Sequence, residues 1–114
     1  MNPDDRIWTT RIIRDQQTRA IVGRAGFHAR PDQGGMVEFG FAVDPEFRCR
    51  GYGASTLRTL LEVCRDDPRV NVVRASISPS NWISRRIVTG HGFQKVGEEM
   101  DEEDGMEEVF ELVL

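Results

Sequence analysis

The chain has 114 residues, of which 30% are charged and 39% hydrophobic, and its formal net charge is −4. This length predicts one domain over residues 1–114 with its own core, and the composition is typical of a soluble globular protein. No apolar run approaches the roughly 18 residues of a membrane helix, and residues 1–6 lack the apolar stretch of a signal peptide. We therefore expect a cytoplasmic protein with no membrane partner.

Cysteine spacing and charge distribution narrow the partners further. Cys49 and Cys64 lack the spacing of metal ligands, so we expect free thiols and no metal site. Residues 98–108 hold eight acidic residues and no basic one, which leaves the rest of the chain at +4. The basic residues are scattered arginines without interleaved aromatic residues, so no nucleic-acid partner is predicted. The acidic segment is either a solvated hairpin or a charged functional surface.

The first part of the chain predicts three strands. Residues 8–14 and 19–29 form a hairpin in this interpretation, with a turn at 15–18. Residues 36–43 form the third strand, which ends where Asp44-Pro45 removes a ladder donor. Alternation along that strand places Phe39, Phe41 and Val43 on one face and Glu38, Gly40 and Ala42 on the other.

The second part predicts two helices and three strands. Apolar residues at helical spacing indicate a helix over 53–66, and Asn81 is well placed to cap a second helix that closes at glycines 90 and 92. A strand that follows a crossover helix is most simply parallel to its predecessor. The remaining elements, in chain order, are a strand at 70–77, a helix at 82–89, and strands at 93–99 and 107–114 that meet in a turn at Asp104-Gly105.

The segment from Val43 to Ala54 joins the third strand to the first helix and has the features of an anion site. The first N–H groups of a helix lack intrahelical partners and carry partial positive charge. Gly51 and Gly53 let backbone amides approach a phosphate, and neighbouring arginines add charge. The spacing is not that of a P-loop, and Thr56 stands where a dinucleotide fingerprint needs a third glycine.

Three motifs in this chain resemble the GNAT acetyltransferase superfamily. Arg48, Gly51 and Gly53 match its Arg/Gln-x-x-Gly-x-Gly/Ala loop, and residues 81–93 match its Asn-x-x-Ser helix that ends in Gly-Phe. Residues 38–41, Glu-Phe-Gly-Phe, are similar to a strand of the branch that acetylates ribosomal-protein N-termini and small amines. Together the matches cover about residues 36 to 114 in the expected order.

The resemblance implies an α/β (α+β) fold with a mixed, mostly antiparallel sheet, a central parallel strand pair and two helices. It implies an N-acetyltransferase that transfers an acetyl group from acetyl-CoA, its acyl-donor cofactor, to a primary amine, without a metal. Acetyl-CoA would bind in the loop, along the third strand and at the second helix. The cofactor-binding residues implied are Phe41, Ala42, Val43, Arg48, Cys49, Arg50, Gly51, Tyr52, Gly53, Ala54 and Asn81.

Acyl transfer needs a group that takes a proton from the amine, a donor to the oxyanion, and an acid for the leaving thiolate. We assign Glu38 as the candidate base, directly or through water, and the N–H of Val43 as the candidate oxyanion donor by analogy. Val88 stands where the family often has a tyrosine that acts as the general acid, so Ser84 is the candidate acid here. In this interpretation His91 lies at the C-terminus of the second helix and interacts with the helix dipole. His28 is a second candidate for the acceptor site.

A further departure concerns the N-terminus, where only about ten residues precede the first strand and the family usually has a strand and two helices. We expect those helices to be missing and a homodimer to complete the acceptor site. The acidic residues 98–108 favour a cationic amine or a peptide N-terminus as acceptor. Two alternatives stay open: an acyl-CoA-binding domain without turnover, and a dimerising interaction module.

Overall fold

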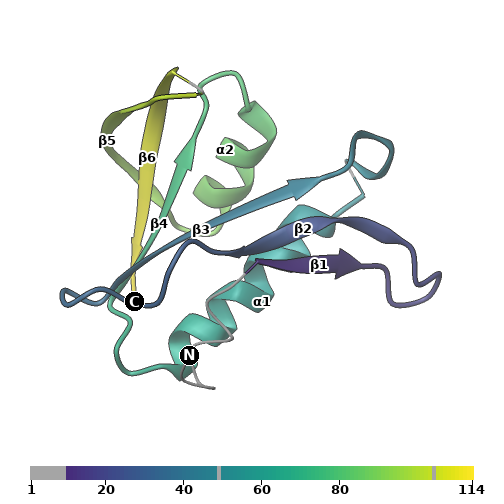
Figure 1. The fold of residues 1–114 in the computed structure, drawn as a ribbon, viewed down its shortest axis with the longest axis horizontal. Coiled ribbons are helices and arrows are strands. Elements are labelled where there is room, and N and C mark those ends of the chain that lie inside the picture. The colour runs from purple at the N-terminus through teal and green to yellow at the C-terminus, as the bar shows by residue number, and fades with distance from the viewer. Residues whose placement is uncertain (1–9, 49, 104) are drawn as a thin grey trace.

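The computed structural model of the chain describes residues 10–48, 50–103 and 105–114. Its strands form one mixed sheet in the order β1-β2-β3-β4-β6-β5 (Figure 1). Every neighbouring pair is antiparallel except β3 and β4, which run parallel as predicted. The strands are β1 (Thr10–Arg14), β2 (Ile21–Phe27), β3 (Met36–Val43), β4 (Val72–Ile77), β5 (Gln94–Asp101) and β6 (Gly105–Val113).

The sheet divides into two halves that share only a short parallel junction. The β3–β4 ladder consists of the pairs Met36↔Val72, Val37↔Val73 and Glu38↔Arg74. Beyond Glu38, β3 stays paired with β2 as far as Val43, while β4 stays paired with β6 as far as Ile77. Figure 1 shows the result: β1, β2 and β3 diverge from β4, β6 and β5, and α2 lies beside the opening.

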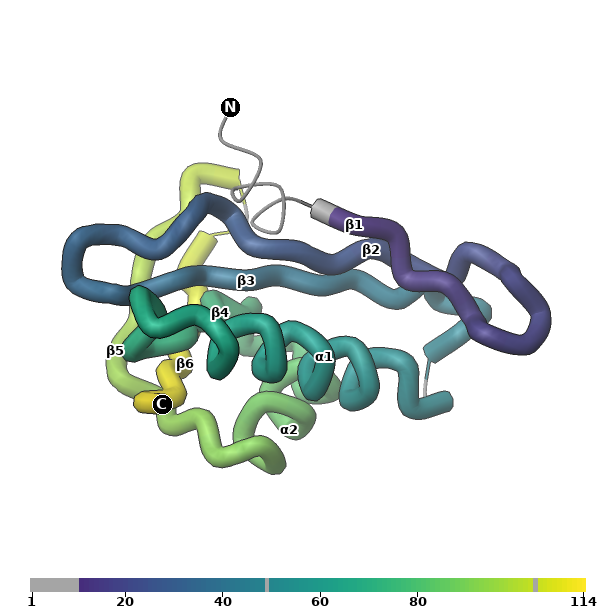
Figure 2. Tube along the Cα trace, turned by 90° about the horizontal axis from the view of Figure 1, so that it is seen from below, coloured from purple at the N-terminus to yellow at the C-terminus, as the bar shows by residue number. Residues whose placement is uncertain are grey.

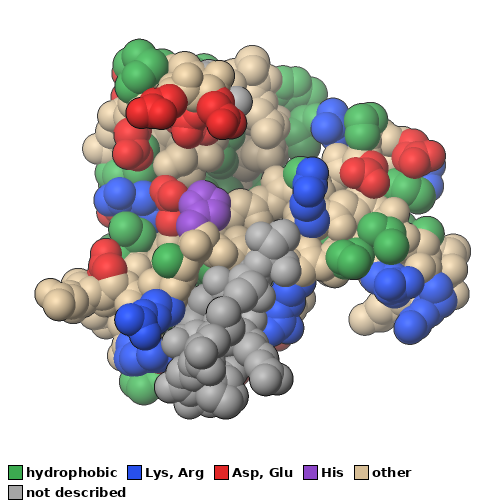
Figure 3. Space-filling view, in the orientation of Figure 1, with side chains coloured by type: hydrophobic (Ala, Val, Ile, Leu, Met, Phe, Trp, Pro, Cys, Tyr) green, Lys and Arg blue, Asp and Glu red, His purple; other side chains and the backbone are tan. Residues whose placement is uncertain are grey.

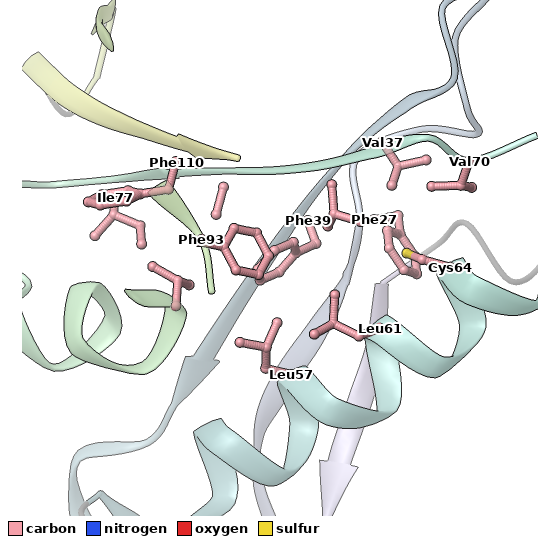
Figure 4. Close-up of a cluster of buried hydrophobic side chains, with 13 residues drawn as sticks. Phe27, Val37, Phe39, Leu57, Leu61, Cys64, Val70, Ile77, Phe93 and Phe110 are labelled. Carbon is pink, nitrogen blue, oxygen red and sulfur yellow. The ribbon is translucent and has the colours of Figure 1, made fainter. Parts of the chain in front are cut away.

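Both helices lie on one face of this sheet (Figure 2). α1 (Tyr52–Asp66) follows the short 3₁₀ helix η2 (Pro45–Phe47), and α2 is Trp82–Gly90. The predicted apolar stripe of α1 faces the sheet, where Leu57, Leu61 and Cys64 are buried. Figure 4 shows them packed with Phe39 and Phe93 in the core. In the part of the chain that the structure describes, neither helix has the length and apolarity to cross a membrane.

The predicted element order is confirmed, and the errors lie at element ends. β3 has the predicted bounds, and α1 begins and α2 ends one residue from the prediction. Strands β2 and β4 are shorter than expected because the backbone leaves the ladder for turns at their ends. Trp8, the predicted start of β1, lies outside the described residues. The last hairpin pairs Asp101 with Gly105, so its turn lies before Gly105.

The predicted caps of α2 explain its boundaries. The Asn81 carbonyl oxygen Oδ1 accepts a hydrogen bond from the Ser84 N–H at 3.2 Å, which is the N-cap arrangement. At the other end, Phe93 N–H donates to Val88 O at 3.1 Å and Gly92 N–H donates to Thr89 O at 3.2 Å. These two bonds, with Gly92 at φ 93°, form a Schellman motif.

No helix among the described residues covers the opposite face of the sheet, which we call the open face (Figure 2). Alternation along β3 places Val37 and Phe39 in the core and Glu38 and Gly40 on the open face. Figure 3 looks onto this face and shows charged side chains and a histidine over the strands. Polar groups are therefore gathered on one side of the sheet at the junction of its two halves.

Candidate active site

The divergence of β3 and β4 leaves main-chain groups of β3 facing a gap. The Glu38 carbonyl accepts from His28 N at 2.8 Å and Asp44 N donates to Val22 O at 2.7 Å, so these alternate residues turn toward β2. Main-chain groups of successive strand residues point to opposite sides. The main-chain N–H and C=O groups of Phe41 and Val43 therefore point toward β4, beyond the end of the β3–β4 ladder. Such an edge suits an extended ligand that bears amide groups.

A cavity of about 680 Å³ lies beside this edge. Its walls are the end of β3, the loop and first turn of α1, and the first turns of α2. The structure thus brings together segments some forty residues apart in the chain, including those that the resemblance implies as cofactor-binding. The predicted cofactor-binding residues among its lining are Phe41, Ala42, Val43, Arg48, Gly51, Tyr52, Gly53, Ala54 and Asn81.

The N-terminus of α1 opens into this cavity. Gly51 is the N-cap at φ 88° and ψ 0°, a left-handed conformation that favours glycine, and it makes no side-chain cap bond. An added Cβ there would meet nothing within 4 Å. The first N–H groups of α1 have no side-chain acceptor at the cap, and they carry the positive end of the helix dipole. The arrangement is able to hold an anion such as a phosphate.

The two arginines of the loop occupy different places. Arg48 lines the cavity, and its Nε donates to the Val43 carbonyl at 3.0 Å, which ties the loop to the end of β3. Arg50 is not among the lining residues; its guanidinium lies over the Phe47 ring, 5.8 Å from the centroid. Cys49, also predicted to bind the cofactor, lies outside the described residues.

Gly53 does more than leave room for a ligand. It is buried, and an added Cβ would lie 2.9 Å from Ile87 Cδ1 and 3.3 Å from the Phe41 ring. The first turn of α1 can approach α2 and β3 this closely only because position 53 has no side chain. Gly53 therefore brings α1 against both α2 and β3, as well as lining the cavity.

The start of α2 forms the other wall. Asn81 Oδ1 caps the helix, which leaves the side-chain NH₂ group to face a ligand. Ser84, the candidate acid, lies one turn further on and also lines the cavity. Val88 is fully buried in the core, so the position matched to the family's tyrosine holds no proton donor.

The candidate base lies on the open face at the last β3–β4 pair. Glu38 Oε2 is 2.7 Å from His28 Nδ1, and Ser76 Oγ donates to Glu38 Oε1 at 2.9 Å. The Glu38 side chain is 27% exposed and that of His28 is 59% exposed. The structure thus places both predicted acceptor-site candidates, Glu38 and His28, in contact. Ser76 was not predicted, although its alternation with Arg74 along the fourth strand could have placed it on this face.

Arg74 and Glu111 form a second pair on the open face. Arg74 Nε donates to Glu111 Oε2 at 2.8 Å, and this contact raises the pKa of Arg74. Glu111 thus engages the guanidinium of Arg74, while the neighbouring Glu38 is hydrogen-bonded to His28 and Ser76.

The family model of the acetyltransferase (GNAT) domain matches residues 2–94. The chain belongs to the GNAT acetyltransferase family. A curated relative is 30% identical over 72% of this chain and 49% of its own length; it is an uncharacterized N-acetyltransferase of Bacillus subtilis, YjdG. Across the curated relatives that it matches, the chain spans 46% to 65% of their length.

Solved GNAT structures share the fold. The ribosomal-protein-alanine N-acetyltransferase of Brucella melitensis aligns with a TM-score of 0.74 at 23% identity, over 88% of this chain and 66% of that one. An aminoglycoside acetyltransferase crystallised with coenzyme A and kanamycin aligns with a TM-score of 0.71 at 20% identity, over 84% of this chain and 62% of that one.

GNAT acetyltransferases take acetyl-CoA as their acyl donor. The cavity of this GNAT domain fits such a molecule: a helix N-terminus that opens at Gly51 suits the phosphates, and the free edge of β3 suits the amide-bearing arm. No cluster of side chains within the described ranges has the composition of a metal site.

A hydrogen bond that was not predicted joins the β1–β2 turn to the cofactor loop of this GNAT domain. By cofactor loop we mean the segment between β3 and α1 together with the first turn of α1. Tyr52 Oη donates to Asp15 Oδ2 at 2.6 Å, while Asp15 Oδ1 accepts from the N–H groups of Thr18 and Gln17. The turn amides and Tyr52 lower the pKa of Asp15 to about 2. Asp15 and Tyr52 are 37 residues apart, and only the Asx-turn pattern at Asp15 is visible in the sequence.

Proposed function

We propose that this chain is an acetyl-CoA-dependent N-acetyltransferase, or the catalytic part of one, that acetylates a primary amine. The observation that carries the proposal is the cavity between the free edge of β3, the N-terminus of α1 and the capped start of α2. All three walls carry the motifs by which the chain resembles the family. The bound donor supplies an activated acetyl thioester.

The residues have separate tasks in this proposal. The main chain of Phe41 and Val43 holds the arm of the donor, and the N–H of Val43 faces the gap where an oxyanion would develop. The first turn of α1 and Arg48 hold the phosphates. The bonded pair of Glu38 and His28 on the open face draws the proton from the amine, and Ser84 is the donor to the leaving thiolate.

We propose a cationic amine, small molecule or peptide N-terminus, as the acceptor class. Support comes from the β5–β6 hairpin: Ile77, the last residue of β4, pairs with Glu108, so the hairpin projects beyond β4. Figure 3 shows acidic side chains gathered at its tip. Further from the tip, two carboxylates are paired, since Lys95 Nζ lies 3.1 Å from Glu98 and 3.1 Å from the buried Glu108. Arg85 Nε also lies 3.1 Å from Glu108. Glu102 and Glu103 stay exposed.

One alternative function has an observation in its favour. Val88 offers no proton donor, which is compatible with a domain that binds acyl-CoA without turnover. The homodimer also stays a proposal: the open face carries exposed apolar side chains such as Ile12, at 59%, that a second copy could cover. Sedimentation at micromolar concentration tests it, and a monomer in the presence of acetyl-CoA would contradict it.

The deciding experiment measures free-thiol release from acetyl-CoA with a panel of cationic, neutral and anionic amines. Calorimetry with acetyl-CoA runs in parallel. Amine-dependent thiol release supports the enzyme, whereas binding without release supports the acyl-CoA-binding domain. The absence of both results contradicts the proposed function.

A further inference from the structure

The geometry points to His28, and not Glu38, as the group that takes the proton from the acceptor amine. We propose that Nε2 of His28 is the base, and that Glu38 and Ser76 are positioning residues that hold the imidazole in place. This inference rests on the proposed function and identifies a catalytic residue within it. Sequence reasoning gave His28 only as a second candidate.

Both carboxylate oxygens of Glu38 are engaged. Oε2 contacts His28 Nδ1 at 2.7 Å and Oε1 accepts from Ser76 Oγ at 2.9 Å. A carboxylate held by one partner on each oxygen is fixed in orientation, with both oxygens already occupied. Glu38 is therefore better placed to hold a group than to accept the amine proton directly.

The contact with Glu38 determines the tautomer of His28. An ionised carboxylate can only accept, so the 2.7 Å contact assigns the hydrogen of the neutral imidazole to Nδ1. The lone pair then lies on Nε2. A carboxylate that holds one ring nitrogen leaves the other nitrogen unprotonated. This is how a histidine is set up to act as a general base.

Nε2 of His28 lies beside Gly40 of β3. An added Cβ on Gly40 would lie 3.3 Å from this nitrogen, so the ring lies against the backbone of β3 at Gly40. Gly40 is two residues beyond Glu38, where the β3–β4 ladder has ended. The His28 side chain is 59% exposed, so the ring is open to an amine that approaches over the open face. The base thus lies where the cofactor gap begins.

The surrounding charges support the pair. On the open face, Glu38 on β3 faces the imidazole directly, and Arg74 on β4 lies next to Glu38 but is engaged by Glu111 on β6. Glu99 on β5 also interacts electrostatically with Arg74. An imidazolium formed at His28 is therefore stabilised by Glu38, while Arg74 is largely compensated by acidic neighbours.

The proton and electron balance is complete with the two substrates alone. The lone pair of the neutral amine forms the N–C bond to the thioester carbon, and the C–S bond breaks with its electron pair on sulfur. The amine proton passes to His28 Nε2. The thiolate takes a proton from solvent, directly or relayed through the Ser84 hydroxyl, which regains its own proton from water, and the imidazolium later releases its proton to water.

The test compares matched variants of the whole chain. His28→Asn retains an amide donor near the Nδ1 position but lacks Nε2, so kcat should fall about a hundredfold with unchanged acetyl-CoA affinity. Glu38→Gln and Ser76→Ala leave Nε2 in place and should cost about tenfold or less. His91→Asn is the control, because His91 Nδ1 only contacts Ile87 O at the end of α2.

The outcomes separate the inference from the proposed function. If the wild-type chain acetylates an amine and His28→Asn does so equally well, the inference is wrong and the function stands. A larger loss in Glu38→Gln than in His28→Asn would make Glu38 the direct base. If the wild-type chain acetylates no amine, the proposed function fails and the inference fails with it.

A second measurement needs no turnover. Long-range ¹H–¹⁵N correlation spectra report which ring nitrogen of a neutral histidine carries hydrogen, and His28→Asn assigns the signals. We expect hydrogen on Nδ1 in the wild-type chain and a loss of that preference in Glu38→Gln. Hydrogen on Nε2 of His28 in the wild-type chain would overturn the proposal.

Discussion

The two halves of the sheet differ in charge and in what they bring to the site. The half made of β1, β2 and β3 carries arginines on its hairpin, and it provides the cofactor loop, the free edge of β3, and both His28 and Glu38. The half made of β4, β6 and β5 carries the acidic hairpin and the capped start of α2. Figure 3 shows the contrast, with basic side chains over the β1–β2 hairpin and acidic ones over β5–β6.

The candidate active site is therefore formed only where the two halves of the sheet meet. The junction of three residue pairs keeps them together, and the divergence beyond it creates the cavity. The anionic acetyl-CoA suits the first half, and the cationic acceptor that we propose suits the second. Variants that act on the contact between halves, on the gap, or within one half should therefore have separable effects.

The largest effect is expected where the halves touch. Gly53→Val would push a branched side chain into Ile87 and the Phe41 ring, so we expect a loss of about 3 kcal/mol in unfolding free energy. Gly90→Ala is the control, because an added Cβ there meets nothing within 4 Å. Urea unfolding measures both. Wild-type stability in Gly53→Val would show that the halves are not in close contact at α1.

The next effect tests whether the gap between the halves binds the phosphates of acetyl-CoA. Ala54→Asp and Ser55→Asp each add a carboxylate to the first turn of α1, where the helix dipole stabilises it. Ala54 lines the cofactor cavity, whereas Ser55 lines a different cavity under the β1–β2 hairpin. Ala54→Asp should weaken acetyl-CoA binding about tenfold or more by repulsion of the phosphates, and Ser55→Asp much less.

Calorimetry at low and high salt measures this pair of variants. The difference between them should shrink as salt screens the added charge. Equal losses in both variants would mean that the donor does not bind at this helix N-terminus.

The third effect concerns the acidic half. Glu102→Lys with Glu103→Lys should lower kcat/KM for a dicationic amine several-fold at low salt and leave a neutral amine unchanged, because steering falls with ionic strength. The double variant Glu62→Lys with Asp66→Lys makes the same charge change on exposed positions of α1 and is the control. Initial-rate assays of acetyl transfer with the dicationic and the neutral amine measure this change in kcat/KM. No cation preference at any salt concentration would make the hairpin a solvated face only.

Local sequence signals predicted much of this molecule. The bounds of β3, the Asn81 cap and the glycine end of α2 depend on neighbouring residues, and all three are confirmed. The family's motifs also led to the residues that now line one cavity, although their binding roles stay predictions.

What could not be predicted depends on register and distance. The contact between His28 and Glu38 arises because β2 and β3 pair in one register, and a slip of one residue would place them on opposite faces. The end of the β3–β4 ladder at Glu38 depends on how both halves pack against the helices. No pattern within either strand marks that point, so the shape of the gap required the structure.

The smallest effect lies within the first half, at the Asp15–Tyr52 bond. The hydrogen bonds to Asp15 lower its pKa to about 2, from 3.8. A carboxyl group whose pKa is lower in the folded state stabilises the fold above the unfolded value and loses that contribution as the pH falls through about 2. NMR titration of the Asp15 carboxyl should therefore show a midpoint near 2, and Tyr52→Phe should raise it because one donor is removed. The turn amides of Thr18 and Gln17 remain, so the midpoint should stay below 3.8. An unchanged midpoint in Tyr52→Phe would show that the β1–β2 turn and the cofactor loop are not bonded in solution.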